Sequence, residues 1–157
     1  MHDTSHETRK QEALAPSAEK KNGHCINVGC GPAPTLGYLN YDNNLLVLLA
    51  RVPSAMQLLK ALGLLQKEPY DQYQFGKTVR EIGIKWANCT KHIPVSNASV
   101  RIVYASHVFE HLDQGEARRF LDEIDRVLMP GGWLRLLVPD LKRIVDVYQE
   151  HADADAL

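Results

Sequence analysis

The sequence predicts an α/β fold, in which a mostly parallel β-sheet is flanked by helices. Short apolar runs such as HCINVG (24–29) and SVRIVYAS (99–106) have the length and the β-branched content of buried strands. Longer segments with helical spacing of their apolar residues lie between such runs, and this alternation is typical of βα units. The chain has 157 residues, 45% of them hydrophobic, which suits one domain with a buried core.

The strands and the first helical segment follow in chain order. Five strands are expected, at 24–29, 37–42, 82–89, 99–106 and 133–139. Residues 43–68 form a leucine-rich helical pattern that Pro53 interrupts, and a loop is expected over 69–76. We expect these leucines to pack in the core rather than to bind a partner or a membrane surface. The short link between Val28 and Leu39 predicts a compact loop, or a first helix replaced by the leucine-rich segment, because a parallel crossover usually contains a helix.

Two later helices have clear start signals. Asp113 is a candidate N-cap, and Glu116, three residues on, completes a capping box. Apolar residues at helical spacing follow, and Pro130-Gly131-Gly132 is expected to end this helix. A last helix is expected to begin at Asp140.

Charge and composition narrow the possible partners. The formal net charge is −1, so no global field attracts nucleic acid or an anionic membrane surface. The three cysteines form no C-x-x-C pair, which favours a reducing compartment, and residues 1–22 are a polar tail without a secretory apolar region. We therefore expect a cytoplasmic protein whose folded domain covers 23–157. The longest apolar run, at 45–50, is too short to span a bilayer.

Candidate binding residues follow the predicted strands, because parallel sheets bind ligands at the carboxyl ends of their strands. Gly29 and Gly31 allow a ligand to approach the backbone closely. Pro34 replaces the last glycine of the dinucleotide fingerprint, which disfavours a pyrophosphate cofactor. Asp42 can accept hydrogen bonds from ribose hydroxyls, and it can also cap a helix that starts near Asn43, since the two roles are compatible.

Three segments together resemble class I S-adenosylmethionine-dependent methyltransferases. They are INVGCG…GYLNYD, ANCTKHIPVSNASVRIVYASHVFEHL and FLDEIDRVLMPGGWLRLLVPD, and they lie within residues 24–148. The similarity is closest to a bacterial branch with a glycine-cysteine-glycine loop and a serine-histidine-x-x-glutamate-histidine-leucine segment. The resemblance implies a Rossmann-like sheet of strand order 3-2-1-4-5, helices on both faces, and methyl transfer from S-adenosylmethionine to a small-molecule, saccharide-type or lipid-type acceptor.

The resemblance also implies the residues that bind the cofactor. They are Gly29, Cys30, Gly31, Asp42, Asn43, Asn88, Cys89, Ser106 and His107. The glycine loop would lie along the methionine part, and Asp42 would hold the ribose hydroxyls. Asn88 or Cys89 would border the adenine, Asn88 through its carbonyl oxygen. Ser106 and His107 would lie near the sulfonium.

The segment ASHVFEHLDQG (105–115) also permits a different interpretation. His107, Glu110 and His111 form the H-x-x-E-H pattern of inverted zinc proteases, in which two histidines on one helix face bind zinc. The sequence offers no clear third ligand, with Glu150 as the only late candidate, so we expect no zinc. We expect His107 in the loop after the fourth strand and His111 on a short helix. Both remain candidate catalytic residues, and a structural role for His111 is equally open.

The sequence given stops before strands six and seven of the family fold could follow. A non-catalytic module that binds S-adenosylmethionine is therefore the second hypothesis. If strand five is an edge, its apolar sequence WLRLLVP (133–139) would recruit another strand, and a homodimer through this edge is expected.

Overall fold

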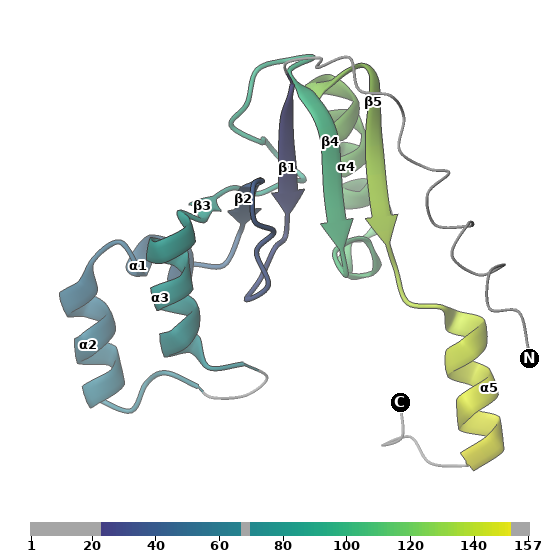
Figure 1. Cartoon of the computed structure of the whole chain (residues 1–157). Helices are drawn as coiled ribbons and strands as arrows, with labels where there is room; N and C mark the ends of the chain where they lie inside the picture. Colours follow the sequence, from purple (N-terminus) through teal and green to yellow (C-terminus); the bar gives the residue numbers. More distant parts are fainter. Residues whose placement is uncertain (1–22, 67–69, 152–157) are drawn as a thin grey trace, which may run out of the picture.

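The computed structural model describes residues 23–66 and 70–151, so the predicted tail 1–22 lies outside the described residues. These residues form a five-stranded sheet of order β3-β2-β1-β4-β5 in which all neighbouring strands are parallel (Figure 1). The strands are β1 His24–Val28, β2 Leu39–Asp42, β3 Lys85–Trp86, β4 Val100–Ser106 and β5 Leu128–Leu137. The predicted α/β class and strand order are confirmed.

The helices differ in how closely they lie against the sheet. They are α1 Leu46–Leu49, α2 Pro53–Ala61, α3 Gln72–Ile82, the 3-10 helix η1 Phe109–His111, α4 Gln114–Val127 and α5 Leu141–His151. In Figure 1, α4 lies behind β4 and β5, whereas α1, α2 and α3 gather beside the β3 edge and α5 lies beyond the end of β5. Two apolar clusters result. One joins the sheet to α4, and the other joins α1, α2 and α3.

The link between β1 and β2 is a compact loop of turns, which is one of the two forms expected from its length. Two buried amides fix it. Asn27 Nδ2 donates to Thr35 Oγ1 at 3.0 Å and to Asn40 Oδ1 at 3.2 Å, while Asn40 Oδ1 also accepts from Thr35 N at 2.8 Å. Because these side chains cross-link both strands and the loop, the glycine segment that begins the loop has a defined position.

Helix α4 has the predicted start but a different end. Asp113 Oδ1 accepts from Glu116 N at 2.7 Å, and Asp113 N donates to Glu116 Oε2 at 3.2 Å, so the capping box is confirmed. The helix ends at Val127, before the Pro-Gly-Gly sequence, and β5 includes that sequence. The predicted strand at 133–139 therefore begins earlier than expected.

Two predictions between β2 and β4 were wrong. The predicted loop over 69–76 contains the start of α3, which Asp71 caps by accepting from Tyr73 N and Gln74 N. The predicted strand at 82–89 is reduced to Lys85–Trp86, because Ile82 still belongs to α3 and Gly83 ends that helix with a left-handed φ of 78°. Gly76 lies in the middle of α3. Gly76 is required there, since a Cβ would lie 2.5 Å from Met56 Cε of α2.

The leucine-rich segment is less buried than predicted. The chain does break at Pro53, which is the first residue of α2. Leu46, Val47 and Met56 pack in the second cluster. Most of the other large apolar side chains of this segment are exposed, namely Leu45, Leu48, Leu49, Val52, Leu58, Leu62 and Leu64. The expectation of ordinary core packing is thus wrong for these side chains.

Candidate functional site

Two neighbouring cavities, each of about 320 Å³, open at the carboxyl ends of the strands. Gly29 and His107 line both of them. The nine predicted cofactor-binding residues all line one cavity or the other. The first cavity includes Asp42, Asn43, Asn88 and Cys89, and the second includes Cys30, Gly31 and Ser106. The structure therefore brings together residues from four separate stretches of the chain.

The sequence reasoning missed several lining residues. They are Ala87, Thr90, Val108, Leu112 and Glu116 in the first cavity, and Asn27, Pro32, Ala33 and Tyr104 in the second. Most are direct neighbours of predicted residues, so extending each strand-end motif by one or two positions would have found them. Glu116 is different, since it lies on α4 and not beside a predicted strand end.

The glycine loop after β1 needs both of its glycines, for different reasons. Gly29 has a φ of 65°, and a Cβ there would lie 2.4 Å from Val108 Cγ2. Gly31 has a φ of 50°, but a Cβ there would meet no heavy atom within 4 Å. Both dihedrals favour glycine. Only Gly31 faces open space, so a ligand can approach the backbone there.

Asp42 connects the end of β2 to the glycine loop. Its Oδ2 accepts from Gly31 N at 2.7 Å, and its Oδ1 accepts from Asn44 N at 2.8 Å. The second predicted role, a helix cap near Asn43, was wrong because α1 begins only at Leu46. Each carboxylate oxygen has two lone pairs, so Asp42 can accept further hydrogen bonds from a ligand in the first cavity.

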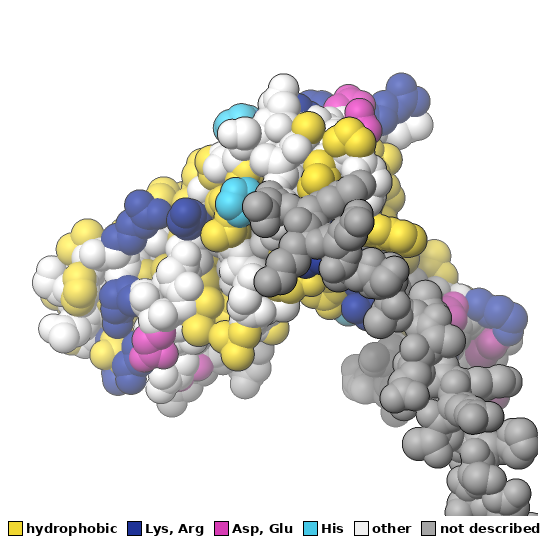
Figure 2. Space-filling view, turned by 45° about the horizontal axis from the view of Figure 1, so that its top comes forward, with side chains coloured by type: hydrophobic (Ala, Val, Ile, Leu, Met, Phe, Trp, Pro, Cys, Tyr) yellow, Lys and Arg dark blue, Asp and Glu magenta, His cyan; other side chains and the backbone are white. Residues whose placement is uncertain are grey.

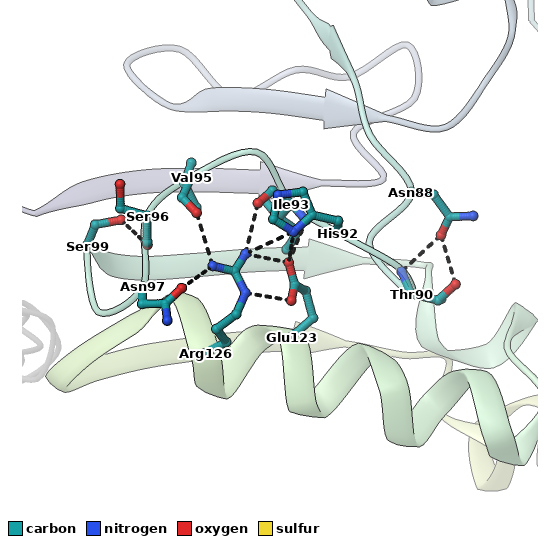
Figure 3. Close-up of polar contacts among 10 residues, drawn as sticks. All are labelled: Asn88, Thr90, His92, Ile93, Val95, Ser96, Asn97, Ser99, Glu123 and Arg126. Carbon is teal, nitrogen blue, oxygen red and sulfur yellow. Dashed lines mark hydrogen bonds and ion pairs between the residues drawn. The ribbon is translucent and has the colours of Figure 1, made fainter.

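Asn88 presents a different group from the one predicted. Its Oδ1 accepts from Thr90 N at 3.0 Å and from Thr90 Oγ1 at 2.8 Å (Figure 3). Because a backbone N–H can only donate, this contact fixes the oxygen and places the NH₂ group on the other side. Asn88 therefore offers a donor for a ring nitrogen, whereas the predicted acceptor oxygen is already engaged.

Both cysteines of the cavities are neutral thiols at physiological pH. Burial, together with the charge of Asp42, raises the pKa of Cys30 to about 12. Burial is also the largest cause that raises the pKa of Cys89 to about 11. A thiol is a far weaker nucleophile than a thiolate. Neither cysteine is therefore suited to attack an electrophile in the site.

The histidines lie where the sequence placed them. His107 follows β4 with a φ of 55°, and His111 is the last residue of η1. His107 Nδ1 lies 3.1 Å from Glu110 Oε1, so the glutamate pairs with one imidazole instead of lying between the two. Within the described ranges, no group of three His, Cys, Asp or Glu side chains could hold a metal ion. The expected absence of zinc remains a prediction, which mass spectrometry of the purified protein tests.

Glu123 and Arg126 form an ion pair on α4 (Figure 3). This pair holds residues 93–95, which follow the cavity-lining residues 87–90 along the chain. Arg126 Nε donates to Glu123 Oε2 at 2.7 Å, and Glu123 Oε1 accepts from Ile93 N at 2.6 Å. Arg126 also donates to the carbonyl oxygens of Val95, at 3.1 Å, and Ile93, at 3.0 Å. Hydrogen bonds from Arg126 hold the pKa of Glu123 below its ordinary value. The loop between Asn88 and β4 is thereby fixed to α4.

Residues 26–136 match the family described as a methyltransferase domain. Because this match covers most of the chain, the chain belongs to the methyltransferase domain family, as the resemblance predicted. No curated protein matches the sequence.

Several solved structures are similar to the chain. The PH0226 protein of Pyrococcus horikoshii is 16% identical with a TM-score of 0.49, and the alignment covers 84% of this chain and 56% of that one. A putative S-adenosyl-L-methionine-dependent methyltransferase of Methanococcus maripaludis is 12% identical with a TM-score of 0.43, over 85% of this chain and 58% of that one. The chain thus spans less than two thirds of the length of these proteins.

Proposed function

We propose that the chain binds S-adenosylmethionine at the carboxyl ends of its strands and transfers the methyl group to an acceptor. The observation that carries the proposal is Asp42, a carboxylate only 7% exposed that lines the first cavity and keeps acceptor capacity. A buried carboxylate without a cationic partner is costly unless hydrogen bonds satisfy it. Backbone donors provide two of these bonds, and ribose hydroxyls would provide the rest.

The two cavities support a division of the cofactor between them. The first cavity suits the adenosine, because Asp42 can accept from the ribose and the Asn88 amide can donate to the ring. The second cavity suits the methionine part, because Gly31 offers open backbone space there. Gly29 and His107, which line both cavities, would then lie beside the sulfonium.

The residues around the sulfonium would mainly align the acceptor. The cofactor supplies an already activated methyl group, so orientation of the acceptor behind it is the principal requirement. His107 is the candidate base where the acceptor must lose a proton. Its Nδ1 pairs with Glu110, which leaves Nε2 as the proton acceptor in that tautomer. His111, which lines the first cavity, is the second candidate.

Replacement of Asp42 tests the binding site. Asp42→Ala should weaken S-adenosylhomocysteine binding by about 1–3 kcal/mol, because the ribose loses hydrogen bonds to a charged acceptor. Titration calorimetry measures this change. Asp42→Asn keeps the shape and one acceptor oxygen, but its NH₂ group would face the N–H of Gly31 or Asn44. Circular dichroism of each variant therefore guards against a trivial folding defect.

Asp140→Ala is the matched control, since Asp140 is an exposed carboxylate after β5 that lines neither cavity. Equal affinities for the wild-type protein, Asp42→Asn and Asp42→Ala, all folded, would remove Asp42 from the site. No binding by the folded wild-type protein at millimolar ligand would refute the proposal. Binding without turnover on any acceptor would favour the second hypothesis, a non-catalytic binding module.

We also propose a homodimer through the edge of β5. In the described part of the chain, β5 is the last strand of the sheet, and its Trp133 is 70% exposed. An apolar edge of this kind recruits a further strand. Light scattering should report a dimer at micromolar concentration that Trp133→Lys dissociates, whereas Leu36→Lys, at an exposed position of the β1–β2 link, should leave it intact. A monomeric wild-type protein would contradict this proposal.

A further inference from the structure

The exposed apolar side chains of the leucine-rich segment take no part in the proposed site. We call Leu45, Leu48, Leu49, Val52, Leu58, Leu62 and Leu64 the leucine surface. Leu58 and Leu62 are 59% and 60% exposed, and their spacing of four residues places them on the same face of the turn that ends α2. Burial of a leucine side chain is worth about 1.5–3 kcal/mol, so a set of exposed leucines indicates a surface that meets another apolar phase.

The charged residues of the segment that carries this surface have one sign. Residues 43–66 contain Arg51 and Lys60 but no aspartate or glutamate. The ammonium groups of Lys60 and Lys77 both lie over the ring of Tyr73, at 4.1 Å and 5.1 Å from its centroid. This arrangement collects two cations beside α2. The chain has a net charge of −1, so the positive charge is a local feature that the total conceals.

Figures 1 and 2 place this feature in the molecule. The lobe on the left of Figure 1 consists of α1, α2 and α3. On the same side of Figure 2, yellow hydrophobic patches lie among dark-blue basic side chains, and magenta acidic side chains lie in the lower part of this lobe. Within the described part of α3, the acidic residues Asp71 and Glu81 are at its two ends.

We propose that the leucine surface docks on an anionic lipid bilayer. Insertion of exposed leucines and attraction of basic residues to anionic lipids together bind a protein to a membrane surface. A second copy of the chain fits less well, because both copies would bring the basic residues Arg51 and Lys60, and no acidic residue of 43–66, to the interface. Among the described residues, no helix is long and apolar enough to cross a bilayer, so docking would be peripheral. Asn43, which lines the first cavity, lies two residues before Leu45, so docking would bring that cavity near the lipid headgroups.

Vesicle sedimentation with the full chain tests the proposal. The wild-type protein should bind vesicles of mixed phosphatidylglycerol and phosphatidylcholine, and it should bind pure phosphatidylcholine at least about tenfold more weakly, because two cations near the surface lose their attraction. Leu58→Ser/Leu62→Ser should lower the partition coefficient on the anionic vesicles by at least about tenfold. Arg51→Gln/Lys60→Gln should also lower this partition coefficient by at least about tenfold. High salt should reduce the difference in partition coefficient between this variant and the wild-type protein.

Leu121→Ser is the matched control, because Leu121 is an exposed leucine on α4 outside both cavities. This variant should bind vesicles as the wild-type protein does. Circular dichroism and titration with S-adenosylhomocysteine should give the same result for all variants, which separates this proposal from the proposed function. Wild-type protein that stays in the supernatant at physiological salt would overturn it. So would self-association, lost in Leu58→Ser/Leu62→Ser, without vesicle binding, since the surface would then serve a second copy of the chain.

Discussion

Arg126→Met should lower the free energy of unfolding by about 3–5 kcal/mol, because it leaves the buried carboxylate of Glu123 without its cation. Glu123 is only 8% exposed, and Arg126 supplies two of its hydrogen bonds. The same change also removes the donors that hold the carbonyls of Ile93 and Val95. Chemical denaturation measures the loss.

Arg118→Met makes the same chemical change at an exposed position of α4 and should alter stability by less than about 0.5 kcal/mol. Glu123→Gln should cost less than Arg126→Met, because a neutral amide oxygen can still accept from Ile93 N. Equal effects of Arg126→Met and Arg118→Met would show that the ion pair does not stabilise the fold.

At acid pH, the free energies of unfolding of the wild-type protein and Arg126→Met should differ less than at neutral pH. Hydrogen bonds from Arg126 lower the pKa of Glu123 in the folded state from its ordinary value of 4.5. The stabilisation by the ionised pair is therefore fully present above the ordinary pKa. It is lost as the pH falls through the lowered pKa of the folded protein. Denaturation curves from neutral pH into acid test this sign.

Gly29→Ala should destabilise the fold by about 2–4 kcal/mol, since it combines a left-handed backbone with overpacking. The new Cβ would lie 2.4 Å from Val108 Cγ2 at a φ of 65°. Gly31→Ala shares the positive φ but meets no atom within 4 Å, so it should cost only about 1–2 kcal/mol.

The two variants should rank in the opposite order when ligand affinity is measured instead of stability. The Cβ of Gly31→Ala enters the open space assigned to the methionine part, so this variant should weaken S-adenosylhomocysteine binding while the protein stays folded. Thermal melting and calorimetry on the two variants separate the effects. A Gly31→Ala protein that is less stable than Gly29→Ala would contradict the description of the loop.

The sequence predicted β1, β4 and the start of α4 well, because buried strands and capping boxes are local signals. The apolar and β-branched composition of HCINVG and SVRIVYAS predicts buried strands. Asp113 and Glu116 predict a helix start from only four residues. The start of helix α3 was missed because 69–76 is rich in tyrosine and glutamine, a composition that suggested a loop. The capping residue Asp71, the buried Phe75 and Val79, and the final Gly83 were the signals that could have shown it.

The candidate site was predicted at the level of residues but not of atoms. Strand-end position identified Asp42 and Asn88, because parallel strands present their carboxyl ends at one edge. Which atoms remain available depends on tertiary partners. Gly31 N and Asn44 N occupy part of the Asp42 carboxylate, and Thr90 occupies the Asn88 oxygen. The exposure of Leu58 likewise depends on which elements pack against α2, and the local sequence does not predict this packing.

A crystal structure of the protein with S-adenosylhomocysteine tests the central claim most directly. The account predicts ribose hydroxyls within hydrogen-bonding distance of Asp42, the adenine beside Asn88 and Cys89, and the homocysteine part against Gly31. The sulfur should lie near Gly29 and His107. A ligand bound outside both cavities, or a ribose that makes no contact with Asp42, would contradict it.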